Sequence, residues 1–273
     1  MIKDNKSLKV HAHNMRQHIM DMALVAEGSA AHIGGSMSIV EILSYLYFNE
    51  MNIPSLESAN RDRFILSKGH AALAYYAVLI EKGYISEEYK KTFEKNDTIL
   101  AGHPVINPQY GIDFSNGSLG MGLSLGIGVA MAQKKHHSLS RVFVLVGDGE
   151  CNEGSIWEAC MTAAKYELDN LVLVVDNNDF QLGGSNDTVM PLGSLVDKFS
   201  SFGWESITCD GHSFESIGEA LSTCHPLKPL AIVANTVKGK GIPEAENNNS
   251  WHHVVMTPKK YDEIISIWKE QEN

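Results

Sequence analysis

The stretch VFVLVGDGECNEGSIWEACMTAAKYELDNLVLVVDNN, residues 142–178, decides the fold of this chain. Its two apolar runs, residues 142–146 and 171–175, have the composition of buried strands, and the segment between them, about residues 152–166, has a helical pattern. A strand, a helix and a second strand of this kind form a βαβ unit. Because the crossover of such a unit is right-handed, both strands end on the same edge of the sheet.

Polar residues follow both of these strands. A GDG motif (147–149) ends the first strand and a DNN motif (176–178) ends the second, so that Asp148 and Asn178 are predicted to face each other across a crevice. Their oxygens suit Mg²⁺, the glycines let a phosphate approach the backbone, and the following helix N-terminus favours negative charge. The motifs indicate a magnesium–diphosphate site, with a plain turn between strand and helix as the alternative.

Helical and strand patterns alternate along the rest of the chain. Ser36 is predicted to cap the second helix, and Pro258 to open the last one. This alternation predicts an α/β fold, a doubly wound parallel sheet of about five strands with helices on both faces, in a single domain over residues 1–273. The other predicted helices lie at residues 10–27, 37–48, 71–81, 119–132, 192–202 and 214–224, and the other strands at 64–66, 204–208 and 230–234.

The composition excludes several classes of partner. The chain has 273 residues and a formal net charge of −11, without the basic stripe that nucleic-acid binding needs. No apolar run reaches the roughly 18 residues needed to cross a membrane, and residues 1–9 lack the apolar core of a signal peptide. The four cysteines show no Cys-x-x-Cys spacing, which predicts neither a zinc site nor disulfides. We therefore expect a cytoplasmic protein that binds neither nucleic acid nor membrane.

Seven motifs follow one another over about residues 10–255. They are AHIGG (31–35), LSKGH (66–70), GHP (102–104), GSLG (117–120), GDGECNEG (147–154), DNN (176–178), and TVKGKG (236–241) with WH (251–252). With these motifs the chain resembles the diphosphate-binding domain of transketolase, a thiamine-diphosphate enzyme. Transketolases usually add a pyrimidine-binding domain and a third domain, to which nothing here corresponds, so the chain resembles the N-terminal subunit of a split, two-subunit transketolase.

The resemblance implies a cofactor site with two components. Mg²⁺, or Ca²⁺ or Mn²⁺ in its place, would be held by Asp148, Asn178 and the backbone carbonyl of Phe180. Thiamine diphosphate would be bound beside the metal, with the N–H of Gly149 directed at the diphosphate. The other positions that match cofactor contacts in the family are Gly117, Leu119, Gly147, His70 and Glu153.

The resemblance also implies the catalytic groups. His32, His70, His103 and His252 match the family's active-site histidines, and an unperturbed imidazole exchanges protons near neutral pH. Glu153 matches a glutamate that meets a second glutamate from the pyrimidine-binding domain. A surface or core position is the ordinary alternative for each histidine, and for Glu153 the alternative is stabilisation of its helix N-terminus.

The implied reaction is transfer of a two-carbon ketol unit from a ketose to an aldose. The partners would be a C-terminal subunit that carries the pyrimidine-binding domain, in a heterotetramer, and sugars or sugar phosphates as substrates. Three residues depart from the family's usual pattern: Ile33 stands in place of proline, His253 in place of glycine, and Asn116 in place of threonine. Because Ile33 and His253 neighbour expected substrate-binding histidines, we expect a modified sugar as substrate.

Two other functions compete with this interpretation. One is a different thiamine-diphosphate enzyme, such as a deoxyxylulose-phosphate synthase or the α subunit of a 2-oxo acid dehydrogenase. The sequence Glu153-Gly154 and the spaced histidines favour transketolase over these. The other is a cofactor-free relative with a regulatory role, against which the intact pair of Asp148 and Asn178 argues.

Overall fold

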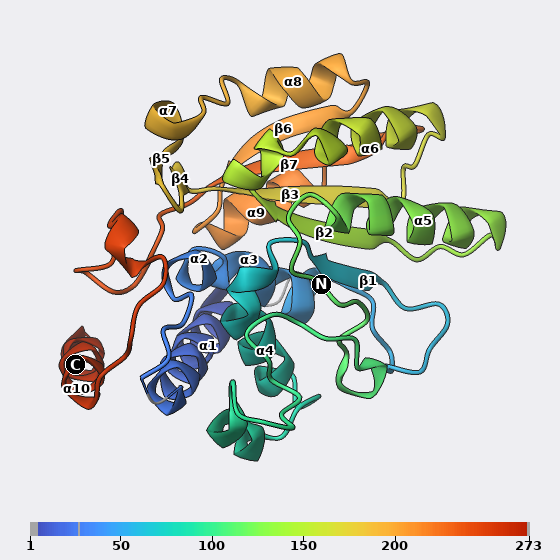
Figure 1. The fold of residues 1–273 in the computed structure, drawn as a ribbon. Helices are drawn as coiled ribbons and strands as arrows, with labels where there is room; N and C mark the ends of the chain where they lie inside the picture. Colours follow the sequence, from blue (N-terminus) through green and yellow to red (C-terminus); the bar gives the residue numbers. More distant parts are fainter. Residues whose placement is uncertain (1–4, 27, 272–273) are drawn as a thin grey trace.

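Five parallel strands form the central sheet of the computed structural model, which describes residues 5–26 and 28–271 (Figure 1). Their spatial order is β1-β2-β3-β7-β6, and every neighbouring pair is parallel. The predicted α/β fold with a five-stranded parallel sheet is therefore confirmed. The strands are β1 (Arg63–Leu66), β2 (Val142–Gly147), β3 (Leu171–Asn177), β6 (Glu205–Asp210) and β7 (Leu230–Asn235).

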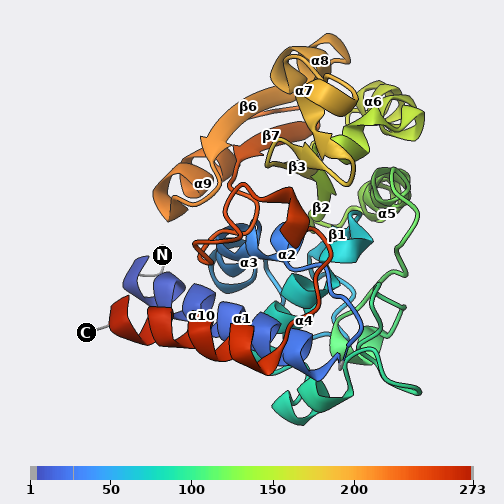
Figure 2. The same cartoon turned by 60° about the vertical axis from the view of Figure 1, so that its left-hand side comes forward.

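Helices cover both faces of this sheet, as predicted (Figures 1 and 2). Alternate residues of a strand point to opposite faces, so Val144 of β2 packs in the core under one helical layer while Phe143 and Leu145 pack in the core under the other. The first layer consists of α5 (Gly122–Lys135), α6 (Gly154–Lys165) and α8 (Leu195–Ser201). The second contains α1 (Asn5–Val25), α3 (Val40–Tyr45), α4 (Ala72–Glu81), α9 (Phe214–Leu221) and α10 (Pro258–Gln271).

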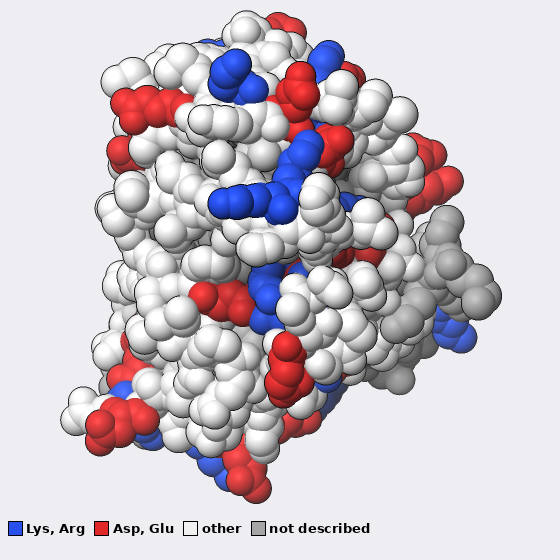
Figure 3. Space-filling view, turned by 90° about the vertical axis from the view of Figure 1, so that its right-hand side faces the viewer, with Lys and Arg blue, Asp and Glu red and all other residues white. Residues whose placement is uncertain are grey.

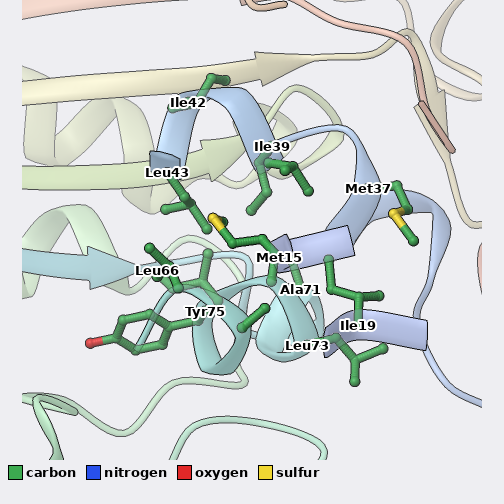
Figure 4. Close-up of a cluster of buried hydrophobic side chains, with 14 of the residues drawn as sticks. Met15, Ile19, Met37, Ile39, Ile42, Leu43, Leu66, Ala71, Leu73 and Tyr75 are labelled. Atoms are coloured by element: carbon green, nitrogen blue, oxygen red, sulfur yellow. The ribbon is translucent and has the colours of Figure 1, made fainter. Parts of the chain in front are cut away.

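The larger core lies between the second layer and the sheet. Figure 4 shows Met15 and Ile19 of α1 directed toward Leu43 of α3 and Leu73 of α4, and all four side chains are buried. Tyr75 keeps its ring in this core while its hydroxyl donates a 2.8 Å hydrogen bond to the carbonyl of Gly111. The polar atom is thereby satisfied in an apolar region, as a buried tyrosine requires.

The second predicted helix, residues 37–48, differs in the structure. It is divided into a short helix α2 (Gly34–Met37), then α3, then a π-helical turn over Leu46–Glu50. Ser36 lies inside α2, and its hydroxyl donates to the carbonyl of His32 at 2.8 Å, so the prediction that it caps the helix was wrong. Its side chain turns back along the chain and closes the turn that carries His32.

Other boundaries moved by a few residues. The helix predicted from residue 119 begins at Gly122, because Gly120 adopts a left-handed backbone with φ of 79°. A hairpin of β4 (Phe180–Gln181) and β5 (Gly184–Ser185), followed by α7 (Asn186–Val189), was not predicted. Glu27, the predicted end of the first helix, and residues 1–4 of the N-terminal segment lie outside the described residues.

The surface and the cysteines agree with the composition. Basic and acidic side chains are interspersed on the face shown in Figure 3, without a basic stripe. Within residues 5–26 and 28–271, no helix combines the length and the apolar character needed to cross a membrane. All four cysteines, which fall within the described ranges, are free thiols; Cys224 is exposed and the other three are buried.

Candidate active site

A cavity of about 380 Å³ opens at the carboxyl ends of β2 and β3. Every residue predicted for the site lines this cavity, although the residues come from seven separate segments of the chain. Their proximity is observed, whereas their chemical roles remain predictions. The predicted residues are His32, His70, His103, Gly117, Leu119, Gly147, Asp148, Gly149, Glu153, Asn178, Phe180 and His252.

Asp148 is the carboxylate at the base of the cavity and is only 1% exposed. One oxygen accepts from the N–H of Gly149 at 2.7 Å, and the other from the N–H of Asp179 at 2.6 Å and the amide of Asn186 at 2.9 Å. Burial and the charge of Asp176 nevertheless raise the pKa of Asp148 to about 6. The surrounding donors do not fully compensate the negative charge of Asp148, and a bound cation would stabilise the ionised carboxylate.

Asp176, the second buried carboxylate, is already neutralised by the protein. Its Oδ2 pairs with the ammonium of Lys68 at 2.5 Å and accepts from the amide of Asn178 at 2.7 Å, and its other oxygen accepts from the hydroxyl of Thr236. Burial acts to raise the pKa of Asp176, but Lys68 and these hydrogen bonds hold it below its usual value. Asp148 is therefore the acid in the better position to meet a cation.

Asn178 is oriented by contacts on both sides of its amide. Its nitrogen donates to Asp176, while its Oδ1 accepts from the N–H of Phe180 at 3.1 Å. Phe180 begins the β4–β5 hairpin, which folds over the end of β3. The carboxylate of Asp148 and the amide oxygen of Asn178 thus line one cavity, as the spacing of the two motifs predicted.

Two residues near Asp148 were missed by the sequence reasoning. Gln181 lines the cavity beside Gly149, where an added Cβ would lie 2.6 Å from its Cγ. Asn186 positions Asp148, as described above. Gln181 Nε2 and Asn186 Oδ1 are buried and have no partner among the described residues. No periodic pattern marked this segment, because the residues belong to a short hairpin and a single helical turn.

Four imidazoles, called here the histidine wall, line the same cavity. The ring of His32 lies 5.4 Å from those of His70 and His252 and 6.0 Å from that of His103, measured between centroids. Burial and neighbouring positive groups lower the pKa of His32 to about 4 and of His252 to about 3, and lower that of His70 well below 6.5. These three rings are therefore neutral at pH 7.

Lys238 reaches this wall from the loop after β7. Its ammonium contacts Asn249 Oδ1 at 2.7 Å and His252 Nδ1 at 3.0 Å, and the residue is 1% exposed. Burial and the charge of Lys68 lower the pKa of Lys238 to about 8, so it is still largely protonated at pH 7. Since an ammonium only donates, Nδ1 of His252 is the acceptor and its proton resides on Nε2.

Two glutamates lie close together in sequence but differ in environment. Glu153 is exposed at the rim of the cavity, where a group outside the chain can reach it. Glu150 is buried and accepts from the hydroxyl of Ser67 at 2.5 Å and from the N–H groups of Gly120 and Gly147 at 2.8 and 3.1 Å. Glu150 was not predicted, and it joins the loop that carries Gly117 and Leu119 to the end of β2.

The residues that depart from the family pattern lie in different places. The exposed ring of His253 stacks on His32, with centroids 4.3 Å apart and an interplanar angle of 25°. Two backbone hydrogen bonds between Ala31 and Val254, at 2.9 and 3.0 Å, fix these segments against each other. The side chain of Ile33 is buried in the core instead. His253 is therefore the departure that extends the histidine wall.

These residues fit a magnesium–diphosphate cofactor. The buried Asp148 lacks full charge compensation, and unpartnered polar atoms of Gln181 and Asn186 lie close by. At Gly117 an added Cβ would meet nothing nearer than the ring of His103 at 3.8 Å, which leaves room beside the backbone. No group of three or more His, Cys, Asp or Glu residues within the described ranges is arranged to hold a metal.

Comparison with known proteins identifies related sequences and structures. Residues 9–270 match the family model described as transketolase, thiamine diphosphate binding domain. One of the subunits of apulose-4-phosphate transketolase from Phocaeicola vulgatus is 38% identical over 95% of this chain and 93% of its own length. The corresponding protein of Actinobacillus succinogenes, which has the same name, is 41% identical over 86% of each chain. The crystal structure of Campylobacter jejuni transketolase superposes with a TM-score of 0.84 and 29% identity, over 94% of this chain but 42% of that one.

Proposed function

The chain belongs to the transketolase family, and from that premise we propose that it is the diphosphate-binding subunit of a two-subunit transketolase. The enzyme would transfer a two-carbon ketol unit from a ketose, or its phosphate, to an aldose acceptor, with thiamine diphosphate and Mg²⁺. The observation that carries this proposal is a single cavity lined both by a buried acidic site, the acidic end, and by the histidine wall, in which three imidazoles are neutral at pH 7.

The acidic end of the cavity is the part suited to the cofactor's diphosphate. Asp148, Asn178 and the carbonyl of Phe180 would hold Mg²⁺, and the backbone at Gly147 and Gly149 would face the phosphates. The N–H of Gly149 donates to Asp148 in this structure and would turn to the diphosphate when Asp148 binds the metal. Asn186 fixes Asp148 for this role. When bound, thiamine diphosphate supplies the nucleophilic carbon and electron sink for breaking and forming carbon–carbon bonds.

The histidine wall is suited to the sugar's hydroxyl groups. Neutral His32 and His70 can each accept a proton on one nitrogen and donate from the other, which ketol transfer requires at the donor's hydroxyls. Neutral His252 can donate from Nε2, since its Nδ1 accepts from Lys238. Lys238 holds His252 with Nε2 as the donor. His32, His70 and His252 can thus orient the substrate and take part in proton transfer without carrying charge of their own at pH 7.

Features of the cavity rim support a partner subunit. Val105 and Ile106 are each 55% exposed and Leu182 is 73% exposed, which places large apolar side chains on segments next to the site residues His103 and Gln181. Exposed apolar surface of this kind is typical of interaction sites. Glu153, at the exposed rim, can meet a carboxyl group from that partner. A C-terminal transketolase subunit in a cytoplasmic heterotetramer is the assembly we propose.

The substrate that we propose is a modified sugar or sugar phosphate. Two relatives are named for apulose 4-phosphate. In this chain His253 adds a fifth imidazole behind His32, which alters the surroundings of a proposed substrate-binding residue. Ordinary pentose and hexose phosphates would then be poorer donors than a ketose with an altered carbon skeleton or substituent.

The test is an assay of the chain together with the polypeptide that co-purifies with it from its source. With thiamine diphosphate and Mg²⁺, we expect transfer of two carbons from a ketose to an aldose. Mass spectrometry with a ¹³C-labelled donor detects this transfer. Release of CO₂ from pyruvate would instead establish one of the other thiamine-diphosphate reactions. A complex with bound cofactor and no turnover of any sugar would refute the proposed reaction.

A further inference from the structure

A partly buried chain of polar contacts reaches the active site from outside its cavity. His212 follows β6, and its ring lies between Glu41 of α3 and the backbone of Val237 in the loop after β7. Nδ1 of His212 lies 3.0 Å from Glu41 Oε2, and the N–H of Val237 donates a 2.8 Å hydrogen bond to Nε2 of His212. His212 does not line the cavity that holds the proposed cofactor site.

The direction of these hydrogen bonds defines the state of the ring. Because the N–H of Val237 donates, Nε2 must be an acceptor, and the proton of the neutral ring is therefore on Nδ1 and directed at Glu41. Glu41 is held in turn by an ion pair of 2.6 Å with Arg16 of α1. Burial acts to raise the pKa of Glu41, but Arg16 and His212 hold it below its usual value, so the carboxylate stays charged.

The loop held by His212 carries a proposed active-site residue. Val237 immediately precedes Lys238, whose ammonium contacts Nδ1 of His252 in the cavity wall. The next residue, Gly239, donates to the carbonyl of Gly34 at 3.0 Å, and Arg16 donates to the carbonyl of Lys240 at 3.2 Å. Three contacts, at Val237, Gly239 and Lys240, thus set the path of the loop on both sides of Lys238.

We propose that His212 is a positioning residue for the reaction, acting through Val237 and Lys238 on His252. The contact of His212 with Val237 fixes the loop, the loop places the ammonium of Lys238, and this ammonium fixes the tautomer of His252. The effect on catalysis rests on the proposed function. The effect of His212 on the loop at Val237 and Lys238, which is the structural step, does not. The glutamate and arginine hold the ring in the orientation in which Nε2 faces Val237.

Two substitutions separate this role from simple filling of space. In His212→Phe the ring shape is kept, but the acceptor for Val237 and the donor for Glu41 are both lost. In His212→Gln the side-chain amide can present an oxygen to Val237 and an N–H to Glu41. His136→Gln, at the exposed end of α5, is the matched control because that ring has no contact with the site.

The first readout is amide hydrogen exchange of residues 236–241 in the full chain, measured without any assay of activity. We expect His212→Phe to accelerate exchange of the Val237 amide by about tenfold, as for loss of one buried hydrogen bond, while exchange in β2 and β3 is unchanged. His212→Gln and His136→Gln should stay within about twofold of the wild type.

The second readout is turnover by the complex with the partner subunit. We expect kcat of His212→Phe to fall by about tenfold with a smaller change in the sugar KM, and His212→Gln to recover most of it. Unchanged exchange at Val237 in His212→Phe would overturn the proposal, as would equal losses in the Phe and Gln variants. Faster exchange with normal kcat would also overturn it. If the wild type has no transketolase activity, the proposed function fails while the exchange result still decides the structural step.

Discussion

Asp148 is buried in the active-site cavity, whereas His32, His70 and His252 are half-buried, and this removal from water shifts the pKa of the acid and the pKa of the histidines in opposite directions. At the acidic end it raises the pKa of Asp148 to about 6, and at the histidine wall it lowers the pKa of His32 to about 4. In each case removal from water favours the neutral form. Removal from water therefore leaves the Asp148 carboxylate less stable unless a cation binds to it, and it keeps His32 uncharged at pH 7.

The difference between the two ends lies in what their neighbours do. Asp148 has a second carboxylate, Asp176, near it, and the ammonium of Lys68 is already paired with that residue. The histidines have other imidazoles and Lys238 near them, which reinforce the effect of burial. A bound Mg²⁺ would compensate the negative charge of Asp148 at the acidic end. The neutral rings of His32, His70 and His252 need no such compensating ion.

Removal of the acid should have the largest effect. Asp148→Ala is expected to reduce Mg²⁺-dependent binding of thiamine diphosphate by more than about 100-fold, because the acidic end then lacks its uncompensated carboxylate. Titration calorimetry of the assembled complex measures this. Asn178→Ala should weaken binding less, since a neutral oxygen is lost. Asp197→Ala, at an exposed position on α8, is the control, and unchanged affinity in Asp148→Ala would place the metal elsewhere.

The raised pKa of Asp148 also predicts the pH dependence of stability. The folded, cofactor-free chain binds a proton at Asp148 more tightly than the unfolded chain does, so this contribution is full below pH 4 and is lost as the pH rises through about 6. Between these values the wild type should lose about 3 kcal/mol of unfolding free energy relative to Asp148→Asn, since each pKa unit corresponds to about 1.4 kcal/mol.

Denaturant unfolding of both proteins at several pH values gives this difference directly. Other titrating groups are common to the two chains and cancel in the comparison. A difference between wild type and Asp148→Asn that stays constant from pH 4 to pH 7 would show that Asp148 has an ordinary pKa.

Lys238→Met should have an intermediate effect, at the histidine wall. The substitution keeps an apolar stem but leaves Nδ1 of His252 without its donor, and we expect a fall in kcat/KM of about 30-fold. Because Lys238 lowers the pKa of His252, its loss should move the acidic limb of the rate profile to higher pH. Lys240→Met, in the same loop but partly exposed, is the control. An unshifted acidic limb would contradict the role given to Lys238.

His253→Gly should have the smallest effect, confined to the choice of substrate. Its ring covers the outer face of His32, so its removal is expected to change the ratio of kcat/KM between a modified ketose and xylulose 5-phosphate by about fivefold, in favour of the ordinary donor. Competition assays with both donors measure this ratio. Efficient use of xylulose 5-phosphate by the wild type would contradict the proposed preference for a modified sugar.

The fold and the pair of Asp148 and Asn178 followed from local patterns in the sequence. Apolar runs ended by the GDG and DNN motifs identified β2 and β3, and parallel crossovers place such ends on one edge of the sheet. The positions of the four histidines came from the family resemblance. Neither periodicity nor spacing alone would have brought His32 and His252 together, since 220 residues separate them in the sequence.

Contacts that depend on tertiary packing were not predictable. Glu150 is buried and Glu153 exposed because a 3₁₀ turn over Gly149–Asn152 precedes α6, and the sequence pattern had assigned a helix from about residue 152. The position of His212 depends on Glu41, 171 residues away, and on the loop after β7. Ser36 has a suitable residue type for a cap, but the chain around it is already helical.

Native mass spectrometry of the complex purified from its source is the most direct test of a two-subunit enzyme that binds thiamine diphosphate and Mg²⁺. We expect this chain together with a second polypeptide, carrying added mass equal to thiamine diphosphate and Mg²⁺ for each site. Removal of Mg²⁺ with a chelator should release both additions together. A chain that is recovered alone or with copies of itself, without cofactor in the presence of excess thiamine diphosphate and Mg²⁺, would contradict the account.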